Sequence, residues 1–188
     1  MRRVPKGHFG YLKYKKKAQL LKSMLVLLSI IVLIVVGLLE TKSIKNWFTI
    51  VAVVTALPFA NFLVVWFALL PHKGRSPEEY EKVKAAAGDG LLSCELVVTS
   101  RDKAMPLAYA FVHSSGIYAY TAQENADLNR IAEHIRSIEE GNGFSVHVKV
   151  FGNLNQFLRR LKELSPESRE TCPDDELRVE GVLRAISI

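Results

Sequence analysis

The segment "LAYAFVHSSGIYAYTAQ" (residues 107–123) contains the central hairpin of the predicted fold. Its parts "LAYAFVH" and "IYAYTA" are rich in aromatic and other apolar residues, which favour β-strands. The intervening "SSG" consists of typical turn residues. Two strands with so short a connection predict an antiparallel hairpin.

The flanking segments extend this hairpin into an α/β domain. Upstream, "LLSCELVVTS" (91–100) predicts a strand that completes an antiparallel meander. Ser76 and Glu79 form a capping box with Pro77 at the first helical position, which predicts a helix over 77–87. Downstream we expect a helix over 126–140 capped by Asn125, a strand over 144–151, a helix after Asn153, a short helix over 173–180 and a closing strand over 182–188.

The predicted fold class is therefore two transmembrane helices followed by an α/β domain. The domain has the order α-β-β-β-α-β-α with a last strand, and an added strand extends the meander. The two apolar runs, 23–39 and 47–70, carry no charge and are long enough to cross a bilayer. The predicted organisation is a basic cytoplasmic tail (1–18), a first span (19–39), an external loop (40–46), a second span (47–70) and a cytoplasmic domain (71–188).

The net charge of +6 is unevenly distributed. From His72 onward, 18 acidic residues outnumber 15 basic ones, so nucleic acid is not an expected partner. The loop between the spans has only Lys42 and Lys45. The positive-inside rule therefore predicts a multi-pass protein of the plasma membrane with both termini in the cytoplasm. The basic tail, which we expect to contact anionic lipid of the inner leaflet, has eight basic residues before the first apolar run: Arg2, Arg3, Lys6, Lys13, Lys15, Lys16, Lys17 and Lys22.

Three residues inside the spans are polar or break helices. Pro58 is central in the second span and is expected to kink it. Asn61 and Ser29 fall at similar depths in their own spans. A hydrogen bond between them is expected to join the two helices.

The sequence contains few residues arranged for reaction chemistry. The five histidines and the cysteines Cys94 and Cys172 show no metal-ligand spacing, and no phosphate-binding or dinucleotide-binding glycine motif occurs. Ser114-Ser115-Gly116 lacks the G-x-S-x-G pattern of a nucleophile turn and is interpreted as a turn. We therefore expect no metal and no cofactor.

The order α-β-β-β-α-β over about residues 77–151, with the hairpin quoted above, resembles the nuclease-related domain family, which has the restriction-endonuclease-like fold. The resemblance implies an Asp on one strand and Glu-x-Lys on the next, where the acids hold a divalent metal and the Lys assists the attacking water. Aligning Gly116-Ile117-Tyr118 with the family's turn places Ala108, Thr121 and Gln123 at those three positions. The resemblance therefore implies a degenerate active site.

The sequence is compatible with three functions. The first is a bacterial double-pass membrane protein whose non-catalytic domain binds or scaffolds a protein partner or a second copy of itself. The second is a membrane-tethered nuclease-like or other hydrolase with altered chemistry that uses Glu95, Glu124 or Asp127. The third is an accessory subunit of a transport or secretion complex.

Overall fold

The computed structural model describes residues 4–72, 74–100, 104–164 and 173–187. The chain divides into two compact units. One is Leu12–Lys73, and the other joins the residues through Tyr11 to Gly74–Ile188.

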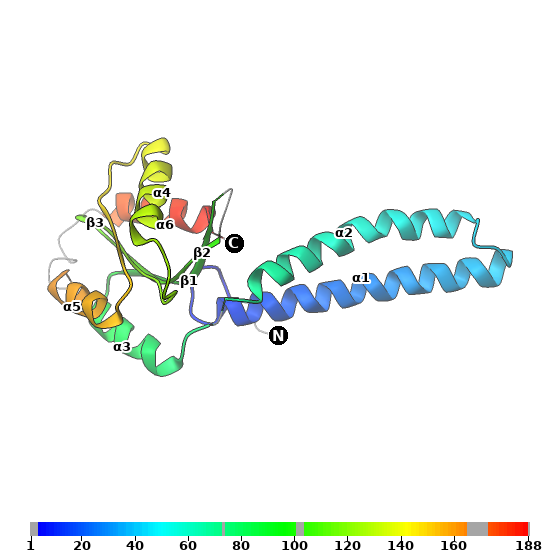
Figure 1. The fold of residues 1–188 in the computed structure, drawn as a ribbon, viewed down its shortest axis with the longest axis horizontal. Helices are drawn as coiled ribbons and strands as arrows, with labels where there is room; N and C mark the ends of the chain where they lie inside the picture. The colour runs from blue at the N-terminus through cyan, green and yellow to red at the C-terminus, as the bar shows by residue number, and fades with distance from the viewer. Residues whose placement is uncertain (1–3, 73, 101–103, 165–172, 188) are drawn as a thin grey trace. The chain divides into compact units, whose positions relative to one another are not determined.

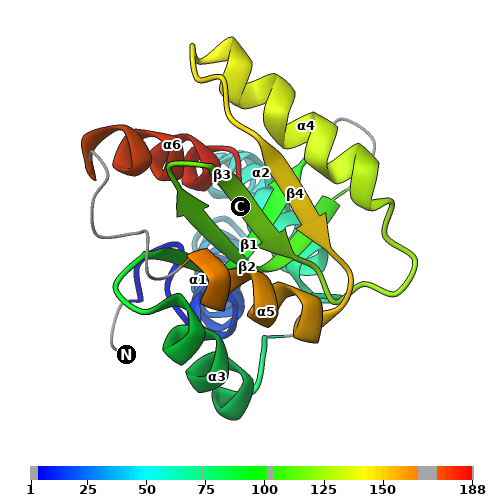
Figure 2. The same cartoon turned by 90° about the vertical axis from the view of Figure 1, so that its left-hand side faces the viewer.

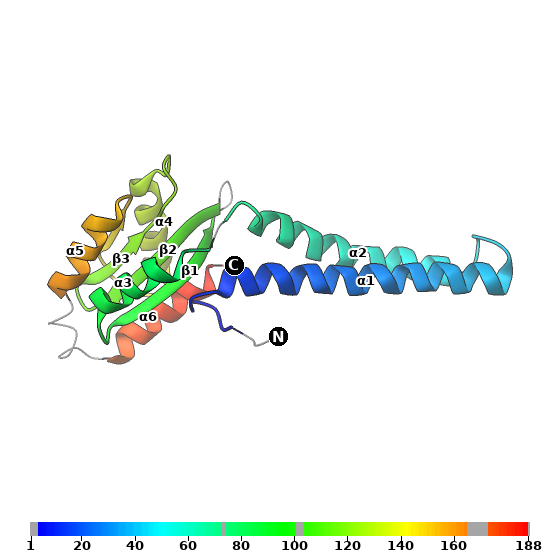
Figure 3. The same ribbon diagram turned by 90° about the horizontal axis from the view of Figure 1, so that it is seen from below.

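The first unit is a helical hairpin. Helix α1 covers Tyr11–Thr41 and α2 covers Trp47–Leu69, and both are long and apolar enough to cross a membrane. They run side by side, joined by a short loop (Figures 1 and 3). Asn46 begins α2, because its side chain accepts a 2.8 Å hydrogen bond from the Thr49 N–H. Helix α1 begins inside the predicted basic tail, where several lysines, which are good helix formers, precede the apolar run.

Polar side chains make hydrogen bonds both within α1 and between α1 and the end of α2. Ser29 Oγ donates to the carbonyl of Val26 in its own helix at 2.7 Å. The predicted Ser29–Asn61 hydrogen bond stays a prediction. At the open end of the hairpin, Lys16 Nζ donates to the carbonyls of Leu70 and His72 at 3.0 and 2.6 Å. This lysine binds the last turn of α2 in addition to adding charge.

In the second unit, the predicted helix over 77–87 is confirmed. Helix α3 spans Pro77–Ala87, and Ser76 Oγ accepts a 3.2 Å hydrogen bond from the Glu79 N–H. The described residues then form a sheet in the order β1-β2-β3-β4. The strands β1, β2 and β3 are antiparallel, and β4 is parallel to β3. The remaining elements are β1 (Leu91–Thr99), β2 (Ala104–His113), β3 (Gly116–Tyr120), α4 (Leu128–Gly141), β4 (Val148–Phe151), α5 (Leu154–Leu164) and α6 (Pro173–Ala185).

Helices cover both faces of the sheet. Helices α4 and α6 lie on one face, and α3 and α5 lie on the other (Figure 2). The core beneath α4 and α6 is aliphatic and contains Ile117, Ile135 and Leu183. The core beneath α3 and α5 is aromatic and contains Tyr118 and Phe157.

Side chains along a strand normally alternate between the two faces of the sheet, but in β1 and in β2 this alternation is interrupted once. Cys94 packs beneath α3 and α5, but Leu96, two residues later, packs beneath α4 and α6. In β2, Tyr109 packs beneath α3 and α5, and Leu107 packs beneath α4 and α6. The register pairs Tyr109 with Cys94 and Leu107 with Leu96, so paired residues lie on the same face. Both strands therefore change face at the row between these pairs. At that row Glu95 has φ of 52°, a left-handed conformation that turns the strand over.

Three sequence predictions need correction. Helix α4 begins after Asp127 instead of Asn125, because Asp127 Oδ1 accepts a 3.0 Å hydrogen bond from the Arg130 N–H. Strand β4 begins at Val148 instead of 144, and the Phe144 N–H donates to the carbonyl of Glu139 in α4.

The predicted closing strand over 182–188 is wrong as far as the described residues reach. Helix α6 continues to Ala185, and only an isolated bridge joins Ser187 to Val98. The acids of its first turn and Arg184 in its last turn both suit the helix dipole. These end effects favour a single helix over the β propensity of the last segment.

Candidate functional site

The turn between β2 and β3 requires glycine at its third position. Gly116 has φ of 138°, and a Cβ there would collide with the backbone carbonyl oxygen of His147. That oxygen accepts a 2.7 Å hydrogen bond from the Ile117 N–H. The close approach lets β4 pair with β3 directly beside the turn, and it brings the turn near the helix that follows β4.

A chain of hydrogen bonds runs from this turn to α5. His113 Nδ1 lies 2.8 Å from Ser115 Oγ, which lies 3.1 Å from Tyr118 Oη. Arg160 Nη2 donates to the same Tyr118 oxygen at 3.1 Å, and Arg160 Nη1 donates to Glu163 at 3.2 Å. These five residues are called the turn–α5 network below. Its hydrogen bonds to Tyr118, and then to Glu163, raise the pKa of Arg160 above its ordinary value.

The donor and the acceptor of each hydrogen bond in the turn–α5 network can be assigned. Arg160 can only donate, and His113 Nδ1 must accept because the Ser115 N–H also points at it at 3.1 Å. The Tyr118 hydroxyl therefore donates to Ser115, and the Ser115 hydroxyl donates to the imidazole. A serine that donates to a histidine nitrogen has the donor geometry of an activated nucleophile.

Two features oppose a nucleophilic role for Ser115. Its own backbone N–H already donates to His113 Nδ1, so the hydroxyl proton of Ser115 competes with another donor for the same lone pair. The other ring nitrogen, Nε2, is buried and has no hydrogen-bond partner in the described parts of the chain, so no carboxylate there orients the ring. The arrangement closes the turn and ties it to α5.

The three positions aligned with the nuclease-related family, Ala108, Thr121 and Gln123, lie at one end of the β2–β3 hairpin. Extending the β2–β3 register, which pairs Tyr109 with Tyr120, places Ala108 opposite Thr121. Thr121 is fully buried, and its Oγ1 accepts a hydrogen bond from the Gln123 N–H at 3.4 Å. Gln123 is exposed. This end of the hairpin is a capped strand end.

The carboxylates weighed for a hydrolase lie in different surroundings. Glu95 is buried within β1, Glu124 is exposed, and Asp127 caps α4. Over residues 4–72, 74–100, 104–164 and 173–187, no group of three His, Cys, Asp or Glu side chains could hold a metal ion.

A second polar cluster lies between β1 and α6. Ser93 Oγ donates to Glu180 at 2.6 Å, and Arg184 donates to both Ser93 Oγ and Glu180 at 3.1 and 2.7 Å. Beside it, burial, and then the charge of Glu95, raises the pKa of Cys94 to about 12. Glu180 and Arg184 are an i,i+4 pair on α6, but Ser93 lies 87 and 91 positions from them, so no local sequence pattern indicates the contact between β1 and α6.

The amino-terminal residues attach to this part of the domain. The Cys94 N–H donates to the carbonyl of Gly7 at 2.7 Å, and Lys6 Nζ donates to the carbonyl of Ser187. Phe9 stacks on Tyr80 with ring centroids 4.5 Å apart. Residues 6–9 are called the amino-terminal strap below. Of the basic residues expected on the membrane surface, Lys6 therefore binds protein, and Arg2 and Arg3 lie outside the described residues.

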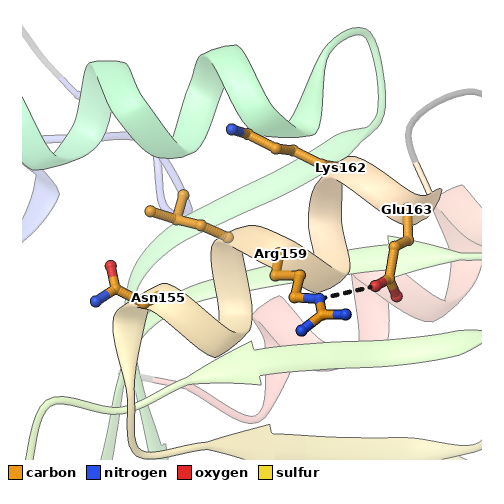
Figure 4. A pocket seen from close by; sticks show the side chains of 5 residues that line it. Asn155, Arg159, Lys162 and Glu163 are labelled. Carbon is orange, nitrogen blue, oxygen red and sulfur yellow. Dashed lines mark ion pairs between the residues drawn. The ribbon is translucent and has the colours of Figure 1, made fainter.

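A groove lies along the last strand. It has a volume of 360 Å³ and is lined by β4, by α5 and by Leu128 at the start of α4. Its lining contains three cations, Lys149, Arg159 and Arg160, and one carboxylate, Glu163. It is called the β4 groove below. A neighbouring hollow on α5 shares Arg159 and Glu163 and adds Asn155 and Lys162 (Figure 4).

Comparisons of the chain with protein-family models, with curated proteins and with solved structures found no match.

Proposed function

We propose that this protein is a small double-pass membrane protein that presents an α/β domain to the cytoplasm for binding or scaffolding a protein partner. The distribution of exposed apolar side chains supports the membrane part. Of the large hydrophobic side chains that are exposed in the described residues, every one except Leu177 lies between Leu20 and Leu70. So large an apolar surface on two adjacent helices needs lipid or protein around it.

The Lys and Arg bias supports the orientation. Eight basic residues precede the first apolar run, and Lys73, Arg75, Lys82 and Lys84 follow the second. Only Lys42 and Lys45 lie in the connecting loop. A bias of this kind retains both flanks, and the domain after them, on the cytoplasmic side.

One observation favours binding over catalysis. The polar side chains around the central hairpin bond to one another or cap strand and helix ends, whereas Lys149 and Arg159 of the β4 groove are exposed and line an open surface. The polar groups near the hairpin therefore serve the fold, and the groove offers a surface for a partner.

The orientation can be tested with single cysteines in the full chain. A membrane-impermeant maleimide should label Ser43→Cys in intact cells, and it should label Gln123→Cys only after permeabilisation. Labelling of Gln123→Cys in intact cells would show that the domain lies outside the cell and would contradict the proposed orientation.

Partner binding can be tested by photocrosslinking in native membranes. A photoreactive amino acid is placed singly at Gln123, Lys149 and Leu177, which are exposed on different parts of the domain. A discrete protein adduct from at least one position is expected. Lack of a protein adduct at all three positions would contradict the binding function.

A further inference from the structure

The two edges of the sheet differ. The described chain covers the edge at β1, where Gly7 accepts a hydrogen bond from the Cys94 N–H and Ser187 forms a bridge to Val98. At the other edge, β4 pairs with β3 alone among the described strands. An open edge is a template for another strand, and proteins ordinarily block it.

The backbone of β4 presents hydrogen-bonding groups to this edge. The carbonyls of His147 and Phe151 accept hydrogen bonds from β3, from the N–H groups of Ile117 and Thr121 at 2.7 and 3.0 Å. Peptide groups alternate in direction along a strand, so those of Val148 and Val150 point away from β3. The four residues of β4 cover about 13 Å at ~3.3 Å per residue, enough to pair with a segment of similar length.

The β4 groove lies directly along this edge and combines an apolar floor with a basic rim. Leu128, Val150 and Phe151 supply the floor. The Lys149 ammonium lies 5.4 Å from the centre of the Phe151 ring, and Arg159 is 86% exposed. Glu163 bonds to both Arg159 and Arg160, so one carboxylate is shared by two guanidinium groups and the lining retains excess positive charge.

We propose that an extended acidic peptide segment of the protein partner adds to β4 as a fifth strand. Backbone hydrogen bonds to Val148 and Val150 supply the pairing, and alternate acidic side chains reach Lys149, Arg159 and Arg160. Charge complementarity selects this occupant, because the domain from His72 onward is acidic overall whereas the groove lining is basic. The proposal rests on the binding function proposed above.

The test uses the full chain in nanodiscs of uncharged lipid and a fluorescent peptide of alternating Val and Glu. The peptide should bind, and its Kd should rise with salt. Lys149→Glu and Arg159→Glu should each weaken binding by about threefold to tenfold, since both side chains are on the exposed rim. The matched control is Lys82→Glu, which reverses an exposed charge on α3 and should leave the Kd unchanged.

Two further peptides separate strand addition from simple charge attraction. The Val-Lys analogue should not bind. In a second peptide, the Val-Glu sequence carries N-methyl groups on two adjacent central residues, so neither side of the peptide strand keeps its central N–H donor. This peptide should bind at least about tenfold more weakly. Equal binding of the N-methylated peptide, or displacement by submillimolar inorganic phosphate, would overturn the proposal in favour of a simple anion site.

The outcome also separates this proposal from the binding function. If the Val-Glu peptide fails to bind while Gln123 or Leu177 still gives a protein crosslink, the edge proposal is wrong and the binding function stands. If the peptide fails and no position crosslinks to protein, both are wrong.

Discussion

Arg160 of α5 donates a 3.1 Å hydrogen bond to the hydroxyl of Tyr118 in β3, and its guanidinium carbon lies 5.0 Å from the centre of the same ring. Tyr118 is only 3% exposed, so this contact fixes the helix against the buried strand. It also orients one of the three cations of the β4 groove. The stability of the domain and the shape of the groove therefore depend on the same pair.

Removal of the Tyr118 hydroxyl should destabilise the domain. Tyr118→Phe loses hydrogen bonds to Arg160 and Ser115, and we expect a loss of about 1–1.5 kcal/mol in the free energy of unfolding. A fall of roughly 4–8 °C in Tm should accompany it, measured on the full chain in detergent by near-ultraviolet circular dichroism. In a double-mutant cycle, Tyr118→Phe should couple to Arg160→Met and not to Arg159→Met. Equal coupling to both arginines would contradict the contact.

The buried carboxyl of Glu139 should make the domain less stable as the pH rises from acid to neutral. Glu139 is 0% exposed, and its oxygens have no hydrogen-bond partner in the described chain, so burial raises the pKa to about 7. The unfolded chain releases this proton near pH 4.5 and the folded chain near pH 7, so stability falls as the pH rises between these values. The shift corresponds to a loss of about 3 kcal/mol.

Thermal denaturation of the full chain at pH 5 and pH 8 tests this dependence. Glu139→Gln, which cannot ionise, should flatten the fall in Tm between the two pH values. The control Glu140→Gln changes an exposed neighbour and should keep the wild-type dependence. If both variants lose stability with pH as the wild type does, another group is responsible.

The amino-terminal strap should require glycine at position 7. Gly7 has φ of 85°, and a Cβ there would lie 2.5 Å from Arg184 Nε in the cluster between β1 and α6. Gly10 has a similar φ of 86°, but a Cβ there would meet nothing within 4 Å. Gly7→Ala should therefore release the strap, whereas Gly10→Ala should add only about 1 kcal/mol of backbone strain.

Hydrogen exchange can distinguish these two variants. The Cys94 amide donates to the carbonyl of Gly7, so its protection should fall in Gly7→Ala and remain in Gly10→Ala. Unchanged protection of Cys94 in Gly7→Ala would show that the domain accommodates the added methyl group.

Local signals in the sequence predict the elements well where a cap or a glycine dictates the backbone. Ser76 and Pro77 set the start of α3, and Gly116 marks the turn between β2 and β3. The capping signal is ambiguous where two competent residues are close together, as Asn125 and Asp127 are before α4. The first residue of such a helix depends on which of the two side chains reaches the free N–H groups of its first turn.

Tertiary packing decides the features that the sequence does not predict. The helical periodicity of α4 includes Ile131, Ile135 and Ile138 on one face, but the buried positions are Ile131, Ile135 and Glu139. The pattern gives no reason to bury a carboxyl group. The Arg160–Tyr118 contact likewise joins residues 42 positions apart, so it depends on how α5 packs on the sheet.

Cys94 should be chemically inert in the folded protein. Its side chain is buried, and its pKa of about 12 leaves a thiolate fraction on the order of 10⁻⁴ at pH 8, against about a quarter for an ordinary cysteine. Alkylation of the native full chain at pH 8, followed by peptide mass spectrometry, should therefore modify Cys94 about a thousandfold more slowly than the denatured chain. The exposed Gln123→Cys provides the accessible reference in the same sample. Native modification of Cys94 at a rate near that of the reference would show that β1 opens readily, and it would restore a redox role as a candidate for this thiol.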